Sequence, residues 1–67
     1  MLDLINKIHF AYNRFEENAI KNRDGNKAAG GRARKISLEL EKLFKQYRKL
    51  SLEIDNHRKQ NSHEDTL

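Results

Sequence analysis

Two stretches of the chain carry apolar residues at helical spacing, and a short polar break separates them. In the first stretch the apolar positions recur every three or four residues: Ile5, Ile8, Tyr12, Phe15 and Ala19. This spacing places them on one face of an amphipathic helix, and Leu4 and Ala11 widen that face. The pattern predicts a helix from about residue 2 to residue 22.

The second stretch has a more regular pattern. Its apolar positions alternate by four and three residues over more than three heptads: Ala29, Ala33, Ile36, Leu40, Leu43, Tyr47, Leu50 and Ile54. A heptad pattern of this length is typical of coiled-coil packing and predicts a helix over about 27–56. The remaining residues, 57–67, are polar and without a period, so we expect a disordered tail.

The break between the stretches carries the turn signals. Asp24-Gly25 and Gly25-Asn26 both favour a backbone that leaves the helix, which predicts a turn over 23–26. Asn26 is a suitable N-cap for the second helix. The chain has no proline, and its three glycines lie within 25–31. Residues 1–56 therefore predict an all-α fold, an antiparallel two-helix hairpin with a longer second helix.

The two predicted helices differ in length, which favours an oligomer. They would be roughly 30 Å and 45 Å long, so the first helix covers the second only to about Tyr47. Leu50 and Ile54 would then be bare. A chain of 67 residues without cysteine also buries little surface and has no disulfide to stabilise it. We expect a homodimer or higher oligomer forming a helical bundle.

Further apolar residues lie off the two main apolar faces. The predicted oligomer interface comprises these and the bare residues: Phe10, Leu38, Leu50, Leu52 and Ile54. The alternative for the three off-face residues is that they are scattered surface apolar side chains, which are common.

Small residues open the second helix. Gly30 and Gly31 each cost about 1 kcal/mol relative to alanine inside a helix, which suggests a compensating need. They allow close packing against Ala19 and Ile20 of the first helix, or close approach of a phosphate backbone. For Ala29 and Ala33 packing is favoured, and for the two glycines both interpretations stay open.

Charge is concentrated around the turn. Residues 21–35 hold six of the 14 cations and one of the 10 acids, a local charge of +5 in a chain of net charge +4. A helix start adds unpaired N–H groups and about half a positive charge. The predicted DNA-binding residues are the cations at the turn and along the outer side of the second helix: Lys27, Arg32, Arg34, Lys35, Lys42, Lys45 and Lys49.

These cations extend over about 30 Å, comparable to one turn of duplex DNA. They would contact phosphates without reading sequence. The alternative is a solvated outer face, which Glu39, Glu41 and Glu53 support for the distal half.

Catalytic and metal-binding patterns are missing from the sequence. The three histidines are too scattered to suggest a metal site, and no catalytic constellation or cofactor motif is present. We expect no enzyme activity, no cofactor and no small-molecule substrate. No apolar stretch approaches the roughly 20 residues of a membrane span, and the first residues do not resemble a signal peptide. A cytoplasmic location without a membrane partner is expected.

Four short segments of the sequence resemble a known family. They are Gly25-Asn26-Lys27-Ala28-Ala29, Arg32-Ala33-Arg34-Lys35, Leu40-Glu41-Lys42-Leu43 and Tyr47-Arg48-Lys49. Over about residues 23–52 the chain resembles the conserved helical domain of chlamydial-type histone-like proteins, bacterial nucleoid proteins named for their similarity to linker histones. The resemblance implies DNA binding and chromosome condensation. Those proteins carry a long basic tail, whereas residues 61–67 here are slightly acidic, so the helices would have to bind the DNA.

The sequence thus predicts a sequence-nonspecific DNA-binding protein of the nucleoid that compacts or bridges DNA through phosphate contacts. The alternative is a coiled-coil interaction or oligomerisation module without nucleic-acid binding, which the bare Leu50 and Ile54 suggest. Self-association of the purified protein would distinguish the two, because a module that needs a partner should be monomeric and poorly folded alone.

Overall fold

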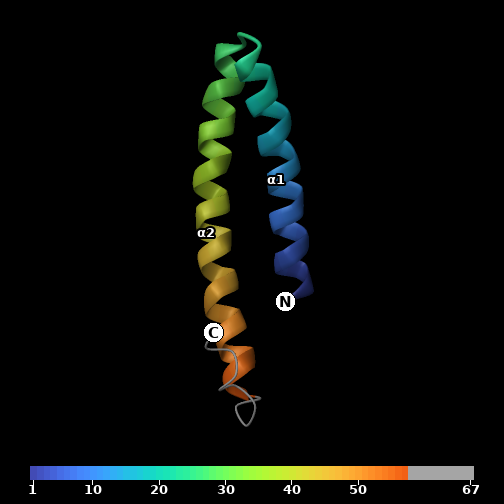
Figure 1. Cartoon of the computed structure of the whole chain (residues 1–67), viewed down its shortest axis with the longest axis vertical. Coiled ribbons are helices and arrows are strands. Elements are labelled where there is room, and N and C mark those ends of the chain that lie inside the picture. The colour runs from blue at the N-terminus through green and yellow to red at the C-terminus, as the bar shows by residue number, and fades with distance from the viewer. Residues whose placement is uncertain (58–67) are drawn as a thin grey trace.

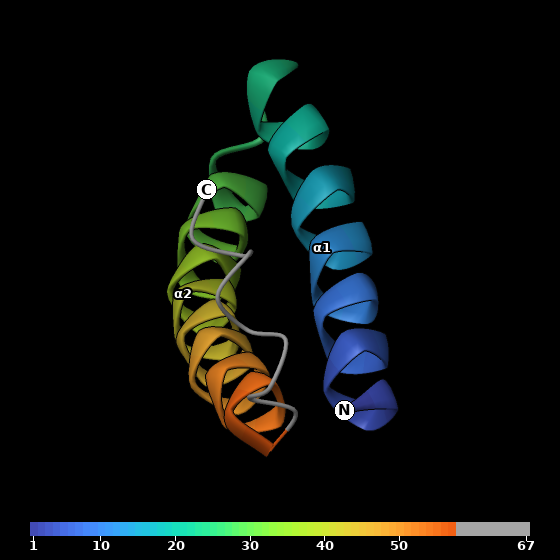
Figure 2. The same ribbon diagram turned by 60° about the horizontal axis from the view of Figure 1, so that its bottom comes forward.

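The computed structural model describes residues 1–57, which form two helices. Helix α1 spans Leu2–Arg23 and helix α2 spans Lys27–His57. They run antiparallel and side by side (Figures 1 and 2), and α2 continues past the N-terminal end of α1 (Figure 1). The predicted two-helix hairpin with a longer second helix is confirmed. The tail predicted for 57–67 lies outside the described residues except for His57, which belongs to α2.

The end of α1 is a Schellman motif. Gly25 has a φ of 110°, a left-handed conformation that glycine adopts without steric cost. The Gly25 N–H donates to the Asn22 carbonyl at 2.9 Å, and the Asn26 N–H donates to the Lys21 carbonyl at 3.0 Å. These two bonds satisfy carbonyls that would otherwise be unpaired at the helix end and turn the chain sharply back.

Asn26 also begins α2. Its Oδ1 accepts a hydrogen bond from the Ala29 N–H at 2.9 Å, the contact expected of an N-cap. The predicted capping role is confirmed. Because Asn26 closes α1 and also caps α2, the connection between the helices is short. The two helices therefore lie side by side from the first helical turn of α2.

The core is the seam where the helices meet. Its buried apolar residues come mainly from α2: Leu4, Ala11, Ala29, Ala33, Ile36, Leu40 and Leu43. Ile8, Phe15 and Leu50 are partly buried against this cluster. The heptad pattern of α2 therefore correctly predicts the buried positions as far as Leu43, whereas Tyr47 is 42% exposed.

The predicted face of α1 is confirmed at Leu4, Ile8, Ala11 and Phe15 but wrong at Ile5 and Tyr12. Leu4 and Ala11 are buried, whereas Ile5 and Tyr12 remain 44% and 47% exposed. The inward positions continue toward the turn as the polar residues Asn18 and Asn22, each seven residues after an inward apolar position. A prediction based on apolar residues places Ala19 on the inward face in place of Asn18. At this end the predicted face is then rotated about the helix axis by about one residue.

The prediction that Leu50 is bare is also wrong. Leu50 packs against the core cluster. Ile54 is half-buried as well. Phe10, Leu38 and Leu52 are 66%, 61% and 63% exposed.

Gly30 and Gly31 differ in their surroundings. A Cβ on Gly30 would lie 2.5 Å from Asn22 Nδ2, whereas a Cβ on Gly31 would have no neighbour within 4 Å. The Asn22 amide is itself held by donating to the Asn26 carbonyl at 3.2 Å. Gly30 therefore lies directly against the Asn22 side chain, which a Cβ at this position would have to displace.

This difference predicts unequal outcomes for two alanine substitutions. Gly31→Ala should stabilise the hairpin by about 1 kcal/mol, the full gain in helix propensity, and raise Tm by about 4–8 °C. Gly30→Ala displaces the Asn22 amide, so most or all of the gain should be lost. Thermal unfolding followed by circular dichroism at equal protein concentration measures both.

The Asn22→Ala background provides the control. With the amide removed, Gly30→Ala should recover a stabilisation similar to that of Gly31→Ala. Equal Tm values for the two single variants would contradict the close contact between Gly30 and Asn22.

Candidate nucleic-acid interface

All seven predicted DNA-binding residues are exposed. By helical spacing, one group lies on the side of α2 away from the seam, and Lys35 and Lys42 border it because they share the heptad position of Lys49. We call this group the outer face: Lys27, Arg34, Lys45 and Lys49.

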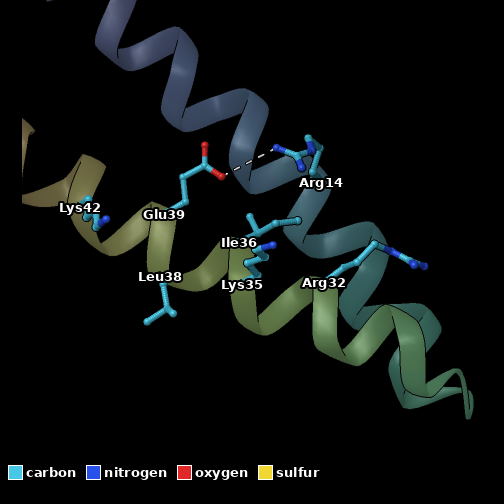
Figure 3. Close-up of a pocket in the computed structure, with 7 residues that line it drawn as sticks. All are labelled: Arg14, Arg32, Lys35, Ile36, Leu38, Glu39 and Lys42. Carbon is cyan, nitrogen blue, oxygen red and sulfur yellow. Dashed lines mark ion pairs between the residues drawn. The ribbon is translucent and has the colours of Figure 1, made fainter.

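The other three predicted cations are Arg32, Lys35 and Lys42, of which Arg32 contacts α1 through Asn18. They belong to an open hollow of about 530 Å³ that both helices line (Figure 3). We call it the lateral groove, and its residues are Arg14, Arg32, Lys35, Ile36, Leu38, Glu39 and Lys42. It contains four cations and one acid, so it attracts anions.

Arg32 is fixed by a contact between the helices. Its Nε donates to Asn18 Oδ1 at 2.8 Å, which turns the side chain toward α1. The bond uses one of the five N–H donors of the guanidinium. Arg32 therefore links the helices and still carries its charge at the edge of the groove.

Arg14 faces Glu39 across the groove. Arg14 Nη1 and Glu39 Oε1 are 3.9 Å apart, and the two side chains are 49% and 54% exposed (Figure 3). A long, single contact between half-exposed groups contributes at most about 1 kcal/mol. Glu39 thus offsets part of the positive charge without locking Arg14 in place.

At the turn, part of the predicted anion site is already occupied. The Ala29 N–H is bonded by the Asn26 side chain, so one of the N–H groups of the α2 start is not available. Arg23 Nε pairs with Asp24 Oδ1 at 3.1 Å. The local positive charge that remains comes mainly from side chains, notably Lys27 and Arg34.

The sequence analysis did not identify Arg14, Asn18 or the position of Glu39. A usable signal was present, because the groove residues directly precede inward positions. Arg14 precedes Phe15, Arg32 precedes Ala33 and Glu39 precedes Leu40. Once the inward positions of both helices are known, the residues directly before them identify the side chains on this flank of the hairpin.

Three partly exposed apolar residues directly follow inward positions on the opposite flank. Ile5, Tyr12 and Phe44 follow Leu4, Ala11 and Leu43, and their exposures are 44%, 47% and 44%. The hairpin therefore has a charged flank and a flank with aromatic and aliphatic side chains.

Metal and membrane sites were also sought over residues 1–57. This part of the chain holds no group of three or more His, Cys, Asp or Glu side chains able to bind a metal ion. Neither of its helices is sufficiently long and apolar to span a membrane.

The chain matches the model of a protein family. Neither the curated proteins nor the solved structures contain a match to this chain. A family model described as "Histone H1-like protein Hc1" matches residues 2–57, which include both helices and the turn. The match extends the resemblance seen over 23–52 to nearly all of α1, and the chain therefore belongs to the histone H1-like Hc1 family.

Proposed function

We propose that this protein is a sequence-nonspecific DNA-binding protein of the cytoplasmic nucleoid that compacts or bridges DNA through backbone contacts. The observation that carries the proposal is the histone H1-like family match over the whole hairpin. The exposure of all seven candidate cations supports it, because a phosphate backbone can reach each of them.

The outer face is suited to a phosphate backbone. Its first and last residues, Lys27 and Lys49, are separated by about 33 Å along α2, close to one turn of duplex DNA. Each lysine or arginine that neutralises a phosphate releases a counterion, so binding should weaken steeply as salt rises. Such contacts position the protein on DNA but carry no sequence information.

Bridging also needs two DNA-binding surfaces in one assembly. We place the contact between subunits at the distal end of α2, where Leu50, Leu52 and Ile54 lie far from the turn. Leu52 is 63% exposed there. Joining two hairpins at this end leaves both turns free, and two weak DNA contacts in one assembly strengthen each other by raising the effective concentration. Leu38, predicted for the same interface, lines the lateral groove instead and is not included in this contact.

The DNA proposal is tested by neutralising cations near the turn. Arg34→Gln/Lys35→Gln should weaken binding to duplex DNA roughly tenfold at low salt and reduce the slope of log K against log salt by about 2. Fluorescence anisotropy with two unrelated duplexes measures both, and the two sequences should respond equally.

The matched control is Lys7→Gln/Arg48→Gln, which removes the same charge from exposed positions outside the predicted set. It should cause a clearly smaller loss. Equal losses would mean that only net charge matters. If the unaltered protein failed to bind DNA at low salt, the proposal would be wrong and the alternative of a helix-pairing interaction module would be favoured.

The oligomer proposal is tested by Leu52→Gln. Because Leu52 is exposed within one hairpin, the substitution should leave the helices folded but shift the assembly toward monomer by tenfold or more in dissociation constant, as measured by sedimentation equilibrium. Ile20→Gln, near the turn and 44% exposed, serves as the control and should leave the association unchanged. An unaltered protein that remains monomeric at high concentration would refute self-association.

A further inference from the structure

We infer that the lateral groove binds one phosphate of the DNA backbone. In the free protein Glu39 pairs with Arg14, and the phosphate replaces the Glu39 carboxylate in this contact. The inference rests on the proposed DNA binding and assigns to it a specific site that includes α1. In Figure 3 Glu39 reaches from α2 toward Arg14, and Ile36 and Lys35 lie beside this pair, with Lys42 and Arg32 farther along α2 on either side.

The charges of the groove come from two separate helices. Arg14 belongs to α1, and Arg32, Lys35 and Lys42 belong to α2. Bringing four cations to one hollow is unfavourable unless an anion lies among them. Glu39 is the single acid that lines the groove, so a net positive charge remains for a second anion to neutralise.

The contact between Arg14 and Glu39 is one that a phosphate can replace. It joins one nitrogen and one oxygen 3.9 Å apart, with both side chains about half exposed. A phosphate instead accepts two parallel N–H bonds from a guanidinium, which gives shorter and stronger contacts. The carboxylate can then turn into water at little cost.

The surroundings of the groove favour this exchange. Ile36 is 4% exposed and forms an apolar base, and Leu38 is 61% exposed at the edge. An apolar base keeps water from one side of the charges and strengthens their attraction. Arg32 is held in advance by Asn18, so less side-chain freedom is lost when the phosphate binds.

The first experiment compares Glu39→Gln with Glu41→Gln in duplex DNA titrations by fluorescence anisotropy. Both substitutions remove one negative charge from α2, but Glu41 does not line the groove. Glu39→Gln frees Arg14 and should tighten binding by roughly two- to fivefold. Glu41→Gln should produce at most half of that gain.

The second experiment concerns Arg14. Arg14→Gln should weaken binding by about three- to tenfold and reduce the salt slope by about 1, and Arg14→Lys should restore the slope but only part of the affinity. Arg48→Gln is the control for loss of one charge. In the double variant Arg14→Gln/Glu39→Gln the gain from Glu39→Gln should fall to that of Glu41→Gln, because only the part that acts through the Arg14 contact is lost.

The outcomes separate this inference from the proposed function. If the unaltered protein binds DNA while Glu39→Gln matches Glu41→Gln and Arg14→Gln matches Arg48→Gln, the groove inference is overturned and DNA binding stands. If the unaltered protein does not bind DNA, the proposed function itself fails. Circular dichroism should show that Arg14→Gln and Glu39→Gln retain the helical content and Tm of the unaltered protein to within a few degrees, because both side chains are half exposed.

Discussion

The double hydrogen bonding of Asn26 fixes the geometry on which the rest of the hairpin depends. Its backbone N–H closes α1 through Lys21, and its side chain caps α2 through Ala29. Because the connection is this short, the turn sets which residues of α1 and α2 lie opposite each other along the whole hairpin. That register brings Gly30 against Asn22, Arg32 to Asn18, and finally Arg14 opposite Glu39. A local turn thus determines which charges meet two or more helical turns away.

The seam changes character along its length, and this change has a functional consequence. Far from the turn the helices meet through leucine and isoleucine side chains. Near the turn the seam consists of small residues on α2 and asparagines on α1, as the contacts of Gly30 and Arg32 show. Asparagine and glycine bury little apolar surface, so hydrogen bonds hold this end together. The polar contacts leave cationic side chains near the surface, where a phosphate backbone can approach them.

Much of the fold follows from the sequence because its strongest signals are local. The heptads of α2 and the Asp24-Gly25-Asn26 turn predict the hairpin and most of the buried positions of α2. The face of α1 was partly misplaced because Asn18 and Asn22 lie at inward positions that a search for apolar residues passes over. The lateral groove could not be predicted for the same reason. Without the correct face of α1, Arg14 has no defined neighbour, and the charge pattern of α2 alone suggests one continuous surface.

The division of the cations between the outer face and the lateral groove bears on how a small protein can act on DNA. Single exposed lysines attract phosphate diffusely and lose this attraction as salt rises. A groove that draws on both helices orients its cations, and a phosphate bound there would hold α1 and α2 together. Binding to the folded hairpin and not to the unfolded chain would then stabilise the fold itself. For a hairpin with so small an apolar core, DNA would serve as part of the folded assembly as well as its ligand.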